Sequence, residues 1–124
     1  MQQSRVLGKR ILVVEDDPSA RESLKLLLCI DRHVVTEARD GVEGLAMLSQ
    51  GHFDLVILDY ALPGVRGNEV AANIRRLAPS LPILMVTAYL EKLTEADKPV
   101  DAVLGKPFAV TELRELIAGL LAGG

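Results

Sequence analysis

The chain has 124 residues, a formal net charge of −3 at pH 7, 49% hydrophobic residues and only 3% aromatic residues. This length suits one domain with an aliphatic core, and the charge shows no sign of the basic stripe that nucleic-acid-binding surfaces carry. Apolar runs are too short to span a bilayer, and residues 1–10 lack the apolar segment of a signal peptide. We therefore expect a cytoplasmic protein that neither inserts into membranes nor contacts nucleic acid directly.

The first strand–helix unit begins with an aliphatic run at residues 11–14. Pro18 suits the first turn of a helix that extends to about Ile30, and Asp17 suits its N-cap. Cys29 is the only cysteine, which excludes an internal disulfide and a multi-cysteine metal cluster. Because Cys29 lies within an apolar helical pattern, we expect a small buried side chain rather than a reactive thiol.

The second unit is a strand at residues 33–36 followed by a helix that Asp40 and Gly41 open and Gly51 closes. In both helices, apolar residues recur every three or four positions, which predicts one buried face on each. The residues expected on these faces are Ala20, Leu24, Leu27, Leu28, Val42, Leu45 and Leu48.

The third strand is a continuous aliphatic run, residues 55–58, that ends in Asp59. A run of this kind predicts a central strand of a parallel sheet, covered by helices on both faces. A third helix then ends before Pro79, and a fourth strand at residues 82–86 ends at Thr87. The inward residues of the third helix are expected to be Val70, Ala71, Ile74 and Leu77.

The end of the chain is less regular. Residues 89–100 predict at most a short helix, because Pro99 interrupts the apolar pattern. A brief strand at residues 102–104 precedes Lys106, and a final amphipathic helix follows. Its inward residues are expected to be Leu113, Leu116, Ile117, Leu120 and Leu121.

Strand and helix therefore alternate five times without a repeat or a linker. This alternation predicts right-handed βαβ crossovers and an α/β, doubly wound, flavodoxin-like parallel sheet with helices on both faces. The common strand order for five such units is 2-1-3-4-5. We expect one domain over residues 1–124, with frayed ends at residues 1–9 and 122–124.

Polar residues follow four of the five predicted strands at their carboxyl ends. In a parallel sheet these ends share one edge, so residues distant in sequence become neighbours. The residues are Glu15, Asp16, Asp59, Thr87 and Lys106. Three crowded carboxylates would raise each other's pKa, and a hard cation such as Mg²⁺ removes that cost. Neither histidine is predicted at this edge, which argues against zinc.

This set of groups suits phosphoryl transfer. Asp59 can attack phosphorus as a carboxylate nucleophile, and Mg²⁺ and Lys106 can neutralise the charge on the equatorial oxygens. Thr87 can hydrogen bond to an acquired phosphoryl oxygen. Each residue alone also has an ordinary structural interpretation: a turn-capping acid, a strand-end threonine or a surface lysine. Because all of these residues occur at the ends of successive strands, the functional interpretation is favoured over the structural one. His33 and His52 have no predicted partner.

Five segments together resemble the receiver domain of two-component response regulators, over essentially the whole chain. They are residues 11–17, 54–59, 62–63 with Gly67, 86–88 and 106–108. The resemblance implies that Asp59 accepts phosphate from a histidine kinase or a histidine phosphotransfer protein. It implies that Asp16 and Asp59 ligate Mg²⁺ directly, that Glu15 acts through water, and that the Ala61 carbonyl completes the protein ligands. Thr87 and Lys106 would contact the phosphoryl group, and the Lys106–Pro107 bond would be cis.

The resemblance also implies a switch, in which phosphorylated Asp59 pulls Thr87 inward and the neighbouring loop and helix reorganise. Two departures from the family pattern concern the output of this switch. Val103 occupies the position, three before Lys106, where the family usually has an aromatic residue. The interval from Thr87 to Lys106 is also short, which predicts a shortened or disordered fourth helix, as in a receiver subgroup with a degenerate fourth helix. Tyr89 is a candidate to replace the missing aromatic, although it also suits a residue that simply covers the sheet edge.

Several functions remain open at this stage. The first is a signalling domain whose phosphorylated state is read by a protein partner. The others are a stand-alone phosphate shuttle or sink, and a receiver segment of a hybrid histidine kinase. A true enzyme on this fold is disfavoured, since Ala61 stands where an aspartyl-phosphate phosphatase has a second acid and no flavin phosphate loop follows the first strand. We therefore expect no enzyme activity beyond self-phosphotransfer and autodephosphorylation.

Overall fold

The computed structural model describes residues 6–93 and 99–121. These residues form a five-stranded sheet in the order β2-β1-β3-β4-β5, with every neighbouring pair parallel. The strands are β1 (Arg10–Val14), β2 (Val34–Ala38), β3 (Leu55–Asp59), β4 (Ile83–Thr87) and β5 (Ala102–Gly105). The helices are α1 (Pro18–Ile30), α2 (Gly41–Gln50), α3 (Gly67–Leu77) and α4 (Val110–Leu121), with a 3₁₀ turn, η1 (Leu90–Lys92). The predicted doubly wound, flavodoxin-like fold and its strand order are confirmed.

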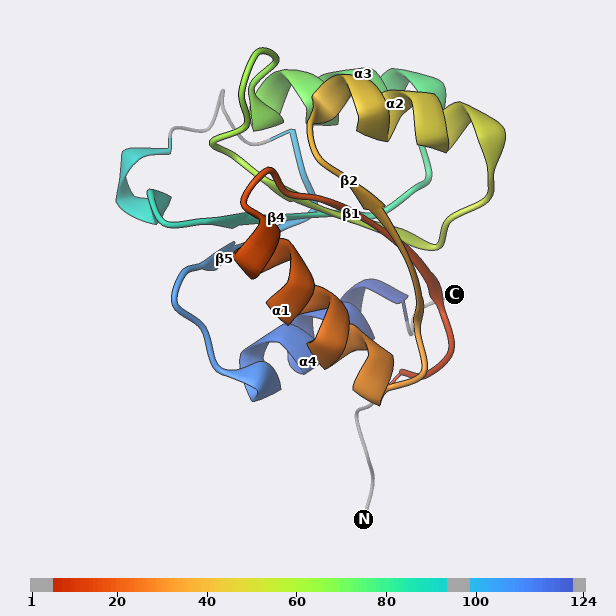
Figure 1. Ribbon diagram of the computed structural model, residues 1–124, viewed down its shortest axis with the longest axis vertical. Helices are drawn as coiled ribbons and strands as arrows, with labels where there is room; N and C mark the ends of the chain where they lie inside the picture. The colour runs from red at the N-terminus through yellow and green to blue at the C-terminus, as the bar shows by residue number, and fades with distance from the viewer. Residues whose placement is uncertain (1–5, 94–98, 122–124) are drawn as a thin grey trace.

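The helices form two outer layers around the sheet. Helices α2 and α3 cover one face, and α1 and α4 cover the other (Figure 1). Because successive strand residues point to opposite faces, each aliphatic strand contributes to two cores. In β1, Leu12 and Val14 belong to the core with α2 and α3, whereas Ile11 and Val13 belong to the core with α1 and α4. This explains why the central strands are apolar throughout rather than alternating.

The start of α3 packs unusually closely on the end of β3. A Cβ atom added to Gly67 would lie 2.4 Å from the Asp59 carbonyl oxygen and 2.6 Å from the Tyr60 Cα. The Gly67 amide also donates a hydrogen bond of 2.9 Å to the Tyr60 carbonyl. Only a glycine fits this contact, which fixes the backbone on either side of Asp59.

Three side chains predicted to be buried are exposed. Val42 is 68% exposed, because α2 approaches the sheet through Gly44, where an added Cβ would lie 2.9 Å from a Val14 methyl group. Leu77 is 63% exposed, since it is the last residue of α3 and lines an open hollow rather than the core. Cys29 is exposed because it lies one residue, or about 100° of helix rotation, past the buried stripe of α1.

The segment between β4 and β5 is short, as predicted. Its described residues contain one 3₁₀ turn, η1, in place of a full helix, and residues 94–98 lie outside the described part of the chain. A Cβ atom on Gly105 would lie 3.0 Å from a Leu90 methyl group, so η1 packs directly on the end of β5. No helix within residues 6–93 and 99–121 combines the length and the apolar character needed to cross a bilayer.

His33 has a partner that the sequence pattern did not reveal. It is 4% exposed, and its Nδ1 atom accepts a 3.0 Å hydrogen bond from the Lys9 amide. Gly8 also donates its amide to the Asp31 carbonyl at 3.1 Å, so residues 8 and 9 are both hydrogen-bonded to the segment between α1 and β2. The ends predicted to fray at residues 1–5 and 122–124 lie outside the described residues. Burial lowers the pKa of His33 and the charge of Lys9 lowers it further, whereas Asp31 opposes both.

We expect stability to fall as the pH drops below about 6.5, the ordinary pKa of histidine. The unfolded chain protonates His33 at a higher pH than the folded chain does, so acid favours the unfolded state. Urea unfolding at about pH 7.5 and about pH 5.5 measures this difference. His33→Asn keeps an acceptor but does not titrate, so it should reduce the difference, whereas the exposed His52→Asn should leave it unchanged. An equal pH dependence in wild type and His33→Asn would contradict this account.

Candidate functional site

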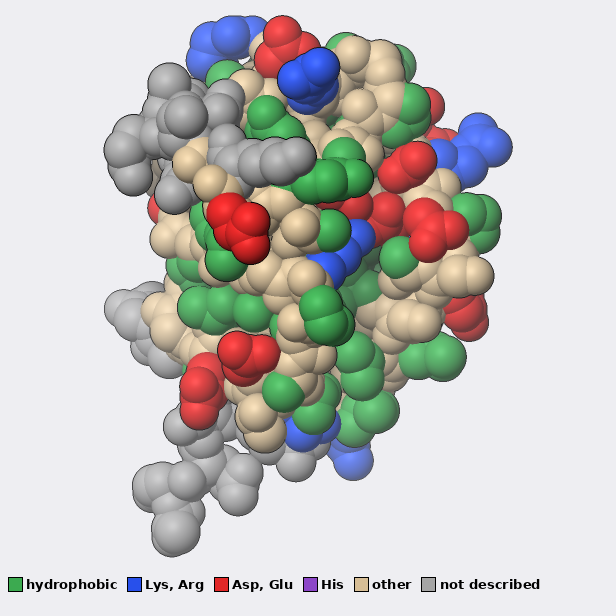
Figure 2. All heavy atoms as spheres, turned by 90° about the vertical axis from the view of Figure 1, so that its left-hand side faces the viewer, with side chains coloured by type: hydrophobic (Ala, Val, Ile, Leu, Met, Phe, Trp, Pro, Cys, Tyr) green, Lys and Arg blue, Asp and Glu red, His purple; other side chains and the backbone are tan. Residues whose placement is uncertain are grey.

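The carboxyl edge of the sheet brings the five predicted side chains together. They follow or end four different strands: Glu15 and Asp16 after β1, Asp59 and Thr87 at the ends of β3 and β4, and Lys106 after β5. Figure 2 shows this side of the molecule, with a basic side chain in a hollow beside a group of acidic ones. The topology thus assembles one polar cluster from segments that are far apart in sequence.

The Lys106 ammonium bridges two of the acids. Its Nζ atom donates to Asp59 Oδ2 at 2.8 Å and to Glu15 Oε1 at 3.0 Å. The Lys106 side chain is 28% exposed, against 10% for Asp59 and 6% for Glu15. Such shielding from water makes these charge-assisted hydrogen bonds stronger than those at an open surface.

Backbone amides orient the remaining carboxylate oxygens. Glu15 Oε2 accepts a 3.2 Å hydrogen bond from the Asp17 amide, and Asp59 Oδ1 accepts a 3.0 Å hydrogen bond from the Ala61 amide. Both bonds close short turns directly after β1 and β3. The two carboxyl groups are therefore held by the backbone as well as by Lys106.

Burial and charge set the protonation of this cluster. Burial raises the pKa of Glu15, the hydrogen bond from Lys106 opposes this, and the nearby charge of Asp59 adds to it. Burial alone would lower the pKa of Lys106, but its hydrogen bonds to Asp59 and Glu15 outweigh burial and the net pKa is raised. Lys106 therefore stays a charged ammonium at neutral pH.

The acids also suit a divalent cation. Glu15, Asp16 and Asp59 each offer one carboxylate oxygen, and these atoms lie within 4.8 Å of one another. Asp16 is exposed, so water can share the coordination sphere, as Mg²⁺ usually requires. Ala61, whose carbonyl is predicted to be a further ligand, lines the same hollow as Asp16. The donor set fits Mg²⁺, and it contains no histidine in the part of the chain that the structure describes.

Thr87 is tied to both neighbouring segments. It is buried, and its Oγ1 atom accepts a 2.9 Å hydrogen bond from the Tyr89 amide at the start of η1. The Lys106 amide donates to the Thr87 carbonyl at 2.8 Å, and a cis peptide bond joins Lys106 to Pro107, as predicted. A movement of the Thr87 side chain would therefore break or shift its hydrogen bond to the Tyr89 amide at the start of η1.

The aromatic position of the family pattern is filled by an aliphatic residue. Val103 pairs with Met85 in the sheet and packs, half-buried, against the core with α2 and α3. Tyr89 is 48% exposed and lines the hollow that contains Asp16 and Ala61. Tyr89 thus lies beside Asp16 at the carboxyl edge of the sheet, and its replacement of the missing aromatic residue stays a prediction.

Several ion pairs that hold helices to this framework did not follow from the sequence patterns, and two of them involve arginines of α1 and α4. Arg21 Nε lies 3.3 Å from Glu37 Oε1, close to the turn that carries the first two acids. Arg114 pairs with buried Asp31 through two hydrogen bonds of 2.9 and 3.2 Å, linking α4 to the end of α1. Neither pair follows from periodicity, but an arginine in the second turn of the helix after the acidic strand end was a usable clue to the first.

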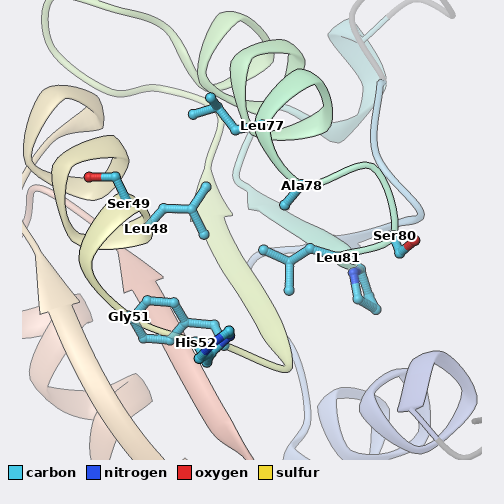
Figure 3. Close-up of a pocket in the computed structure, with 10 residues that line it drawn as sticks. Leu48, Ser49, Gly51, His52, Leu77, Ala78, Ser80 and Leu81 are labelled. Carbon is cyan, nitrogen blue, oxygen red and sulfur yellow. The ribbon is translucent and has the colours of Figure 1, made fainter.

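A second hollow lies at the opposite, amino edge of β3 and β4 (Figure 3). It has a volume of about 410 Å³. Its lining residues are Leu48, Ser49, Gly51, His52, Phe53, Leu77, Ala78, Ser80, Leu81 and Pro82. No lysine, arginine or carboxylate lines it, so it lacks the groups that phosphoryl transfer requires.

Comparison with known proteins agrees with this geometry. The family profile described as "Response regulator receiver domain" matches residues 11–118. The response regulator MprA of Mycobacterium ulcerans is 40% identical over 118 residues, which cover 93% of this chain and 51% of MprA. The chain thus spans about half the length of the curated relatives it matches.

Solved structures show the same architecture. Response regulator protein TrrA from Thermotoga maritima, in complex with Mg²⁺-BeF, superposes with a TM-score of 0.85 at 38% identity, covering 91% of this chain and 99% of TrrA. A complex of TrrA with histidine kinase ThkA gives a TM-score of 0.84 at 38% identity, covering 91% of this chain and 98% of the matched chain.

Proposed function

Because the chain belongs to the receiver domains of two-component response regulators, we propose that it accepts a phosphoryl group on Asp59 in a Mg²⁺-dependent reaction. The donor would be a histidine kinase or a histidine phosphotransfer protein. The observation that carries this proposal is the Lys106 ammonium, 2.8 Å from Asp59 and 3.0 Å from Glu15. The related TrrA, solved with Mg²⁺-BeF and with histidine kinase ThkA, supports both the metal and the donor. We place the reaction in the cytoplasm.

Asp16, Asp59 and the Ala61 carbonyl are the proposed direct ligands of Mg²⁺, with Glu15 acting through water. When bound, Mg²⁺ neutralises the crowded carboxylates and the charge on the phosphoryl oxygens. The shared hollow of Asp16 and Ala61 and the spacing of the acids support this assignment.

In the proposed reaction, an Asp59 carboxylate oxygen attacks the phosphorus of a phosphohistidine. A new O–P bond forms, the P–N bond breaks, and its electron pair returns to the imidazole nitrogen. The Lys106 ammonium offsets the charge on the transferred group, and the buried Thr87 hydroxyl donates to a phosphoryl oxygen. Water then cleaves the aspartyl phosphate. We propose no activity on other substrates.

Incubation with acetyl phosphate, with and without Mg²⁺, tests this function. We expect one phosphoryl adduct in mass spectra of the intact protein, mapped to Asp59 by peptide analysis. Removing Mg²⁺ with EDTA should suppress it, because the acids then repel the incoming phosphoryl group. An adduct on another residue, or one that forms equally well in EDTA, would contradict the proposal.

A second candidate is a phosphate store or sink whose output is competition for the donor's phosphoryl group. Val103 in place of an aromatic residue and the single turn of η1 favour it, because both alter the surface through which a signal would pass. Amide chemical shifts distinguish the two functions. In a signalling domain, changes on phosphorylation of Asp59 extend through η1 and β5, whereas in a sink they stay next to Asp59.

A further inference from the structure

We propose that Arg21 is a positioning residue for Mg²⁺ binding, acting through the backbone of Glu15 and Asp16 and supported by Glu37 on edge strand β2. This inference rests on the Mg²⁺ site of the proposed function. We call the contacts of Arg21 with Glu15, Asp16 and Glu37 the Arg21 clamp.

The clamp joins three segments at one guanidinium group. Arg21 Nη1 donates to the Glu15 carbonyl at 2.8 Å and lies 3.5 Å from the Asp16 carbonyl. Its Nε atom donates to Glu37 Oε1 at 3.3 Å. The Arg21 side chain is only 15% exposed. Because the guanidinium is a rigid planar fork, these contacts fix the direction of the turn between β1 and α1.

The turn after β1 depends on side-chain contacts because its backbone carbonyls lie beyond the hydrogen bonds of the sheet. The last β1–β2 hydrogen bond here runs from the Glu15 amide to the Ala38 carbonyl, at 3.0 Å. Arg21 then contacts the next two carbonyls, those of the residues whose carboxylates face the metal site. Groups that orient metal ligands without touching the metal commonly account for about 10- to 100-fold in metal affinity.

Charge alone predicts the opposite effect. Arg21 is a cation close to a cation site, so its removal should strengthen Mg²⁺ binding if only Coulomb repulsion mattered. Glu37 partly neutralises it, and Lys25 pairs with the other Glu37 oxygen at 3.2 Å. The sign of the change in affinity therefore separates positioning from repulsion.

The test measures Mg²⁺ affinity by isothermal titration calorimetry, without any phosphoryl donor. Arg21→Met keeps an unbranched apolar stem but not the guanidinium donors, and we expect its Kd for Mg²⁺ to rise about tenfold. Lys25→Met is the matched control: it removes a cation from the same glutamate, and no hydrogen bond of Lys25 to Glu15 or Asp16 is present in the described structure. Its Kd should stay within about twofold of wild type.

Arg21→Lys keeps the charge and loses the fork, so its Kd should also rise, by about threefold or more. This milder variant tests the proposal if Arg21→Met does not fold. Unchanged or tighter Mg²⁺ binding in the folded Arg21 variants, with normal binding by wild type and none by Asp16→Asn, would overturn the clamp alone. Failure of wild type to bind Mg²⁺ would overturn the metal part of the proposed function, and the clamp with it.

Discussion

Replacing Asp59 with asparagine is expected to abolish phosphorylation by acetyl phosphate, with a rate at least about 1,000-fold below that of wild type. A neutral amide is a poor nucleophile, and it also removes the charge that holds the Lys106 ammonium at 2.8 Å. Mass spectrometry of the intact variant after incubation with Mg²⁺ and acetyl phosphate measures the loss.

Asp54→Asn is the matched control for this substitution. Asp54 immediately precedes the same strand, at its amino end, and its Oδ2 atom accepts a 2.9 Å hydrogen bond from the Arg10 amide. Asparagine retains an oxygen acceptor there, so the fold and the rate of phosphorylation should both be preserved. A phosphoryl adduct retained in Asp59→Asn would show that Asp59 is not the phosphoryl acceptor.

Replacing Lys106 with methionine is expected to destabilise the Mg²⁺-free domain by about 3 kcal/mol at neutral pH. The substitution leaves the carboxylates of Glu15 and Asp59 close together, almost buried and without their counter-charge. Millimolar Mg²⁺ should recover part of this loss, because the cation binds only the folded site. Urea unfolding with EDTA or with Mg²⁺ measures both effects.

Lys25→Met serves here as well, since Lys25 also pairs with a glutamate, but at an exposed position. Screening by water makes such a pair weak, so the urea midpoint should barely change and should not become more sensitive to Mg²⁺. If Lys106→Met were as stable as wild type in EDTA, the ammonium would not be what stabilises the two neighbouring acids in the folded domain.

The fold was predictable where pattern and topology act together. The aliphatic run of β3 predicted a central strand, and the strand indeed has β1 on one side and β4 on the other. The exposure of Val42 was not predictable from hydrophobic spacing, because α2 is positioned by the close approach of Gly44 to Val14. A hydrophobic pattern is read from large apolar side chains, whereas this contact depends on the absence of a side chain at Gly44.

For the candidate site, the sequence likewise predicted which residues lie together but not how their side chains contact one another. Parallel strands force Asp16, Asp59 and Lys106 to one edge whatever the details of packing. The bridge from Lys106 to Glu15, and the Arg21 clamp, depend on side-chain conformations that no spacing encodes. The partner of His33 was missed for a similar reason, since it is a backbone amide and not a side chain.

The hydrogen bond between Lys106 and Glu15 joins residues that are 91 positions apart. A ribosome adds about 5–20 residues per second, so the acids exist for on the order of ten seconds before the lysine is made. Throughout that interval the growing chain lacks the ammonium that, in the proposed reaction, neutralises the transferred phosphoryl group. If Asp59 is phosphorylated as proposed, chains that end before Lys106 would therefore not compete with the finished domain for the phosphoryl donor.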